Sequence, residues 1–163
     1  PSAGIFDISL EGYVLRAING NDDQDYLFTE TMPGATALAG LDLNVFSPTL
    51  GDDGLVTVCN MSANLTCDHI YEGDDYQDGP DSFVLTYRGR VIDAVSYGTF
   101  AAGMEVRGEG TPVPLTDTDA GKSLNRWPSK DPSKAKDTND NATDFHLAEP
   151  SFGKENNFPP PPN

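Results

Sequence analysis

The chain has 163 residues, of which 26 are acidic and 10 are basic, so its formal net charge is -16. A polyanion of this charge repels nucleic acid, which argues against direct binding of DNA or RNA. No stretch approaches the roughly 18 consecutive apolar residues of a membrane-spanning helix, so we expect no membrane insertion. The acidity itself fits three roles: solubility, divalent-cation binding, and contact with a basic partner or a mineral surface.

Short β-forming runs with period-2 alternation dominate the first hundred residues. Clusters of turn-forming residues, such as NGNDDQD and GDDYQDGPD, separate these runs. Strands at this spacing predict an all-β fold, an antiparallel sandwich or barrel. The predicted strands cover residues 12–18, 26–31, 41–47, 55–59, 65–71, 82–87 and 90–98.

The stretch SFVLTYRGRVIDAVSY predicts a hairpin that turns at Arg88 and Gly89. In its second strand Val91, Asp93 and Val95 alternate with their neighbours, so we expect them on one face of the sheet.

Beyond Gly98 the pattern becomes polar, with one apolar group at SLNRW (123–127), where Trp127 is expected to pack over an end of the core. TDFHLAE (143–149) is predicted to be a last short strand, and FPPPPN a polyproline II tail. The predicted domain therefore spans residues 1–157, followed by a proline-rich tail at 158–163.

Two cysteines lie close together in CNMSANLTC, at Cys59 and Cys67. Such a pair predicts a disulfide across a local turn, formed in an oxidising compartment. A metal site there would need further Cys or His ligands, and the chain has only His69 and His146. The same segment carries two N-x-S/T sequons, at Asn60 and Asn64, and a third lies at Asn141. All three are glycosylation candidates if the chain comes from a eukaryote.

Three stretches resemble the lamin tail domain family in its secreted form. ISLEGYVLRAING is similar to the family's "dL-sGy-L" turn and strand, and YEGDDYQDGPDSFVLTYRGRVIDAVSYG is similar to its central hairpin. SLNRWPSKDPSKAKDTNDNATDFHLAEPSFGKENN resembles its C-terminal ending. The resemblance covers roughly residues 5–157. It implies an immunoglobulin-like β-sandwich that serves as an accessory module of extracellular or cell-surface proteins.

The resemblance also implies a first strand before the "dLsGy" turn, where this chain has PSAG. A sandwich without that strand would expose an unpaired edge. We therefore expect complementation by a β-strand from another chain, or from a cleaved upstream piece. Two alternatives stay open. Either the domain uses residues 1–9 or its tail as the edge, or further residues precede Pro1 and supply the strand. The expected groove is lined by Ile5, Phe6, Ile8, Leu10, Tyr13 and Val14.

Enzyme templates are missing from the sequence: it has no G-x-S-x-G elbow, no H-E-x-x-H and no Walker loop. We therefore expect no catalysis. Three acidic loops are calcium candidates, because closely spaced Asp and Asn side chains supply the oxygens that calcium takes; the alternative is that they form local turns and caps. The candidate ligands are Asp74, Asp75, Asp78 and Asp81, our first choice; Asp22, Asp23 and Asp25; and Asp137, Asn139, Asp140, Asn141 and Asp144.

The function predicted from these features is a secreted, non-catalytic structural or adhesive module, completed by a strand from a protein partner or by self-assembly. Two alternatives stay open: an accessory domain released from a secreted hydrolase, and an acidic matrix protein that binds calcium or mineral. No cofactor other than calcium is expected.

Overall fold

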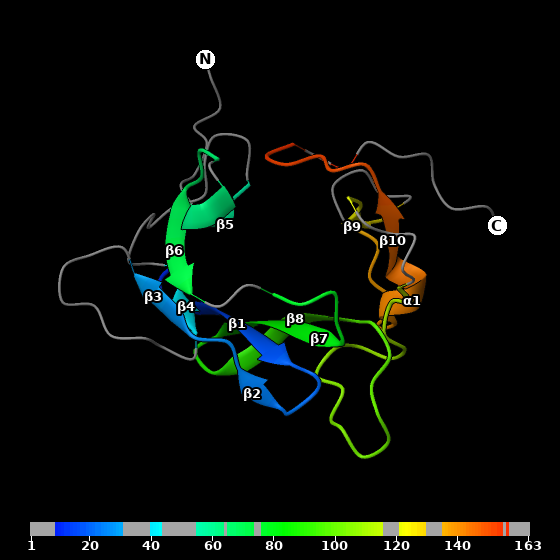
Figure 1. Cartoon of the computed structure of the whole chain (residues 1–163). Coiled ribbons are helices and arrows are strands. Elements are labelled where there is room, and N and C mark those ends of the chain that lie inside the picture. Colours follow the sequence, from blue (N-terminus) through cyan, green and yellow to red (C-terminus); the bar gives the residue numbers. More distant parts are fainter. Residues whose placement is uncertain are drawn as a thin grey trace.

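The chain has an all-β fold, as the sequence predicted, and its strands are mostly antiparallel (Figure 1). Helix is confined, among the described residues, to one four-residue α-helix and one short 3-10 turn. The computed structural model describes residues 9–30, 40–43, 55–63, 65–73, 76–115, 121–129, 135–154 and 156.

The hairpin predicted at Arg88 and Gly89 is present at the centre of the main sheet. It joins β7 (Asp81–Tyr87) to β8 (Arg90–Tyr97), which pair antiparallel. Arg88 has φ 49° and Gly89 φ 76°. Positive φ at both central residues of a two-residue turn gives the backbone twist that matches the flanking strands. The turn residues thus fix the register of the central hairpin.

Strand β1 (Tyr13–Asn19) lies on the other side of β7 and pairs with it along its whole length. Its second edge is shared by two short strands, β2 (Gln24–Asp25) and β4 (Leu41–Asp42). The order across the main sheet is therefore β2-β1-β7-β8, with β4 beside the start of β1. Of the predicted strand at 41–47, only residues 41–42 are a strand, and residues 44–47 lie outside the described part.

A β-bulge changes the alternation that was predicted for β8. Leu85 pairs with Asp93, but Thr86 pairs with Val91, so Ile92 is an extra residue between them. Because one inserted residue shifts the alternation, Val91 does not share a face with Asp93 and Val95. The predicted common face of the three residues is wrong for Val91, whose side chain is 63% exposed.

A second sheet contains β3 (Phe28–Glu30), β6 (His69–Gly73) and β5 (Val58–Asn60), in the order β3-β6-β5. Strands β5 and β6 run parallel, and the turn between them includes η1 (Met61–Ala63). The predicted disulfide between Cys59 and Cys67 is formed across this turn. It ties the end of β5 to the residues just before β6.

The third sheet consists of β9 (Ser123–Arg126) and β10 (Phe145–Ala148), which pair antiparallel. Residues 143–149 were predicted as one strand, and this is wrong at their start: Thr143 and Asp144 belong to α1 (Asn141–Asp144), and the strand begins at Phe145. Within the helical turn Asp144 donates its backbone N–H to the Asp140 carbonyl, and Asn141 and Ala142 donate theirs to the carbonyls of Glu109 and Thr111, in the segment that follows β8.

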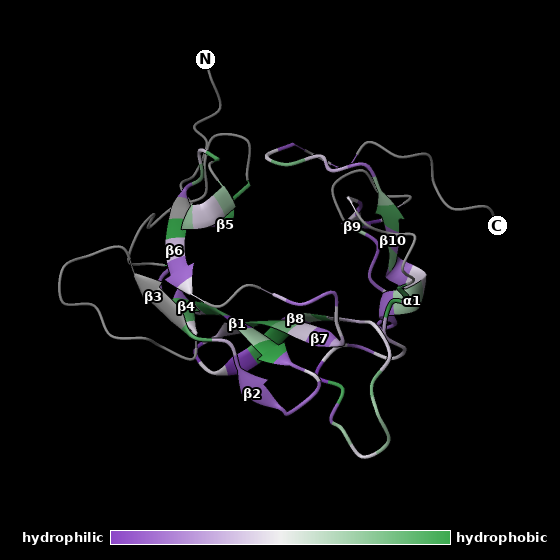
Figure 2. Cartoon of the chain, viewed as in Figure 1, coloured by the Kyte–Doolittle hydropathy of each residue, from purple (hydrophilic) through white to green (hydrophobic). Residues whose placement is uncertain are grey.

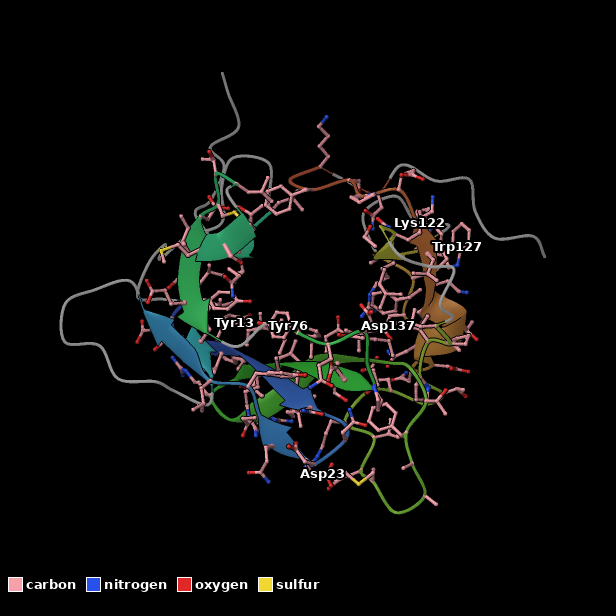
Figure 3. The ribbon with its side chains drawn as sticks, in the orientation of Figure 1. Tyr13, Asp23, Tyr76, Lys122, Trp127 and Asp137 are labelled. Atoms are coloured by element: carbon pink, nitrogen blue, oxygen red, sulfur yellow. A yellow bond between two sulfur atoms is a disulfide. The ribbon has the colours of Figure 1, made fainter. Side chains whose placement is uncertain are left out.

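The main core lies on one face of the central sheet, against the β3-β6-β5 sheet. Hydrophobic residues gather where β1, β7 and β8 meet, whereas β2 is hydrophilic (Figure 2). Tyr13 and Tyr76 lie on the side of the sheet from which β6 rises (Figure 3). The buried members are Leu10, Ala17, Tyr26, Leu41, Leu43 and Tyr71.

The two smaller sheets lie at opposite ends of the central one, with β5 and β6 at one end and α1, β9 and β10 at the other (Figure 1). A smaller apolar cluster of Ile18, Val84 and Ala94 covers the second face of the central sheet. Among the described residues no helix is long and apolar enough to cross a membrane.

Candidate functional site

The β9-β10 sheet is attached to the central sheet by an ion pair. The Arg126 guanidinium donates to both carboxylate oxygens of Asp93, at 2.5 and 2.6 Å. The same guanidinium lies over the Phe145 ring, with its carbon 4.5 Å from the ring centroid. Both hydrogen bonds come from Nη2, and hydrogen bonds between two ionised groups are stronger than those between neutral groups. Arg126 therefore holds β9 and β10 in a defined position beside β8.

A second attachment is the side-chain amide of Asn141, which is completely buried. Its Nδ2 donates to the Ala94 carbonyl, and its Oδ1 accepts from the backbone N–H groups of Ser96 and Glu109, all at 2.9 Å. Val113 also donates to the Ser96 carbonyl at 2.8 Å. The outer edge of the second half of β8 is thus occupied by the chain itself.

Strand β10 has a different environment. Its four residues pair with β9, and no other strand pairs with β10 in the part of the chain that the structure describes. All four residues are partly exposed. Two-stranded sheets are marginally stable alone, and an edge strand offers N–H and C=O groups to another strand. The outer edge of β10 is therefore the candidate site for strand addition.

Two stacked rings lie beside this edge. The Trp127 indole and the His146 imidazole have centroids 3.6 Å apart and planes inclined by 18°. Trp127 lies next to β10 (Figure 3). Burial lowers the pKa of His146 below its usual 6.5. Trp127 was expected to pack over an end of the core; it stacks on His146 of β10 and is not among the residues of the two described core clusters.

The expected strand-1 groove has no open edge beside β1 in the described residues. Leu10 is buried in the main core, and Tyr13 packs against it. Val14 pairs with Thr86 on one side and with Asp42 on the other. A donor strand beside β1 would have to displace β2 and β4. Ile5, Phe6 and Ile8 lie outside the described residues.

The carboxylates of the first acidic loop each have a partner within the chain. Asp22 accepts from the Gln24 N–H, Asp23 from the Glu105 N–H, and Asp25 forms an ion pair with Arg16 at 2.7 Å. The Asp22 contact is that of a local turn, whereas the other two join segments that are further apart in the chain.

The third acidic set is organised in the same way. Asp137 accepts from the Asn139 N–H, and Asp140 accepts from the Thr111 N–H. Asp144 is completely buried and accepts from both the N–H and the hydroxyl of Thr138. Within the described ranges no three His, Cys, Asp or Glu side chains gather as a metal site. Asp23 and Asp137 lie in separate parts of the fold (Figure 3).

The first-choice calcium loop is only partly described. Asp74 and Asp75 lie outside the described residues, and Asp78 is exposed. Asp81 is completely buried and accepts hydrogen bonds from the hydroxyls of Tyr26 and Tyr97, both at 3.0 Å. Burial raises the pKa of Asp81 above its usual 3.8, although these hydrogen bonds lower it. Its side chain therefore belongs to the core, and calcium binding at Asp74 and Asp75 stays a prediction.

The disulfide and a pair of residues outside it, Thr57 and Asp68, close the turn between β5 and β6. Outside the disulfide, Asp68 accepts from both the N–H and the hydroxyl of Thr57, at 2.7 Å. The Asp68 N–H in turn donates to the Thr57 hydroxyl at 2.9 Å. Asn60 stands at the start of this turn, and Asn64 lies outside the described residues. Asn141, the third candidate glycosylation site, is completely buried, so in the folded chain it offers no exposed amide for a glycan.

Sequence reasoning missed the roles of Arg126 and Asn141. Leu124 between the polar residues Ser123 and Asn125 was the local signal for β9, and nothing in SLNRW indicates that Arg126 contacts Asp93. No pattern in the sequence links Asn141 to Ser96, because 45 residues separate them.

No family model, no curated protein and no solved structure matches this chain.

Proposed function

We propose that this chain is a non-catalytic interaction module of an extracellular protein, which takes up a β-strand from a protein partner at the outer edge of β10. The observation that carries the proposal is the two-stranded β9-β10 sheet, whose outer strand has no strand neighbour among the described residues. A third strand would complete this sheet by main-chain hydrogen bonds.

The attachment of the β9-β10 sheet supports this assignment. Arg126 and Asn141 fix the sheet to β8 from the inside, so β10 is held in place before a partner arrives. A preformed edge lowers the entropic cost of binding, because less of the chain has to be ordered. The edge of β8 near Asn141 and the edge of β1 are already occupied, so neither is the acceptor in this proposal.

The extracellular assignment is supported by the disulfide, which forms and persists in oxidising compartments. The resemblance to lamin tail domains adds an immunoglobulin-like topology and an accessory role to the proposal. Self-assembly is the case in which the donor strand comes from a second copy of this chain.

Native mass spectrometry of the natural material, followed by denaturing mass spectrometry, tests the proposal. We expect denaturation to release a second polypeptide, or to separate an assembly into copies of this chain. Hydrogen exchange then locates the contact: amides of residues 145–148 should be protected in the assembly and exchange faster in the isolated chain.

Residues 94–97 of β8 are the internal control, because Asn141 and Val113 already cover their outer edge. Their exchange should be the same in both states. A single-chain mass throughout, or protection that leaves residues 145–148 unchanged, would overturn the proposal.

A further inference from the structure

The Asn60-Met61-Ser62 sequon has a local geometry that the buried sequon lacks. Asn60 Oδ1 accepts hydrogen bonds from both the backbone N–H of Ser62, at 2.9 Å, and its hydroxyl, at 2.8 Å. The side-chain amide and the hydroxyl of the sequon are therefore held together. Residues 61–63 form the exposed 3-10 turn η1, so this arrangement lies at the surface.

The nitrogen that would carry a sugar is also accessible to modification. Asn60 Nδ2 makes one hydrogen bond, to the Gly73 carbonyl at 3.4 Å, in an exposed setting. An Asn amide that bears a sugar keeps one N–H, which can go on donating to Gly73. Asn141 offers no such room, because its side chain has no exposed surface and its Nδ2 is bonded to Ala94.

The residues next to Asn60 are apolar and unusually exposed. Met61 is 54% exposed and Leu65 is 50% exposed. The disulfide and the Thr57–Asp68 hydrogen bonds close the turn that carries these two side chains. A glycan on Asn60 would stand beside this exposed apolar surface.

From these contacts we propose that Asn60 carries an N-linked glycan, which shields the apolar turn between Cys59 and Cys67. The glycan comes from a lipid-diphosphate-linked oligosaccharide in the secretory pathway. A bond forms between Asn60 Nδ2 and the anomeric carbon of the sugar, the bond from that carbon to the diphosphate oxygen breaks, and Nδ2 loses one proton. The lipid diphosphate leaves with the electron pair.

The test uses the full chain secreted by a eukaryotic cell line. We expect peptide mass spectrometry to find a glycan on Asn60, which an N-glycanase removes, leaving an aspartate at that position. Asn60→Gln and Ser62→Ala should both lose this glycan, whereas Ser62→Thr should keep it. Asn64→Gln is the matched control that removes the neighbouring sequon, and it should leave the Asn60 glycan in place.

The shielding has its own readout. Enzymatic removal of the glycan from the folded, disulfide-bonded protein should increase the fluorescence of a dye that binds apolar surface. An unmodified Asn60 in the secreted chain, or a glycan on Asn141 of the folded chain, would overturn the assignment. Equal dye binding before and after deglycosylation would overturn the shielding role.

Discussion

The side chain of Asn141 takes the place of a neighbouring strand beside Ser96. Its Oδ1 accepts from the Ser96 N–H while its Nδ2 donates to the Ala94 carbonyl, both at 2.9 Å. One amide thus satisfies a donor and an acceptor on the outer edge of β8, in the manner of a β-ladder. The contact also connects α1, and with it β10, to the central sheet.

Replacing Asn141 should therefore be strongly destabilising. Asn141→Ala leaves the Ser96 N–H, the Glu109 N–H and the Ala94 carbonyl without this partner. Each buried polar group left unsatisfied costs about 1–3 kcal/mol, so we expect a loss of roughly 3 kcal/mol or more in the free energy of unfolding. Urea denaturation followed by circular dichroism measures it.

The matched control for this variant is Asn139→Ala, which changes an exposed Asn two residues away. Asn139 has φ 57°, a conformation that Ala adopts less readily, so a small loss is expected there as well. If both variants lost the same free energy, the role assigned to the Asn141 amide would be wrong.

The buried carboxyl of Asp81 should make the protein more stable in mild acid than at neutral pH. Its pKa is raised in the folded state, chiefly by burial, so the folded state binds the proton more tightly than the unfolded state. The stabilisation is fully present below its usual pKa of 3.8 and is lost as the pH rises through the folded pKa. Burial and the nearby Asp93 also raise the pKa of Glu109, so this group too stabilises the folded chain more in acid than at neutral pH.

The measurement is the free energy of unfolding between pH 4 and pH 8, in the original chain and in Asp81→Asn. We expect the variant to lose part of the pH dependence, since it removes one of the groups that titrate differently on folding. Asp78→Asn, which removes a carboxylate from an exposed position, is the comparison variant. Identical pH dependence of the original chain and Asp81→Asn would refute this account.

The sequence predicted the central hairpin and the disulfide because both depend on residues close together in the chain. Arg88 and Gly89 mark a two-residue turn between alternating runs, and eight residues separate Cys59 from Cys67. The strand limits were less accurate where tertiary contacts decide them. The run predicted at 65–71 becomes a strand only from His69, because the disulfide and the Thr57–Asp68 contacts hold the residues before it in a turn.

The candidate site was harder to predict for the same reason. Asn141 and Arg126 attach α1 and the β9-β10 sheet to β8, and those contacts join residues 33 to 47 positions apart. The acidic residues show the same limit. Asp81 and Asp144 were candidate metal ligands because other Asp and Asn residues lie near them in the sequence. In the structure both are buried and accept hydrogen bonds from other parts of the chain. Burial is a property that no local pattern of Asp residues reveals.

Removing the disulfide should reduce stability by about 2.5 kcal/mol. This figure follows from the chain entropy of a closed loop of about nine residues. Cys59→Ala with Cys67→Ala tests it, and the free energy of unfolding should fall by that amount. Thr57→Val is the comparison variant, because it removes the two hydrogen bonds that the Thr57 hydroxyl makes with Asp68 and leaves the disulfide in place. An unchanged free energy in the double Cys variant would mean that the outer contacts alone hold the turn.

Trp127 should report the protonation of His146. A protonated imidazole stacked on an indole quenches its fluorescence, and Trp127 is the one tryptophan of the chain. Because burial lowers the pKa of His146, the folded protein should lose fluorescence with a midpoint below pH 6.5. The lowered pKa of His146 also affects stability. Above pH 6.5, the pKa in the unfolded chain, His146 does not reduce the free energy of unfolding. As the pH drops from there through the pKa in the folded chain, the free energy of unfolding falls.

A fluorescence titration of the folded chain measures this midpoint, and His146→Gln is the control that should abolish it. If a partner strand pairs with β10, it covers the strand that carries His146, and added burial should lower the midpoint further. A midpoint at or above pH 6.5, or a titration that persists in His146→Gln, would show that the stack does not control the Trp127 signal.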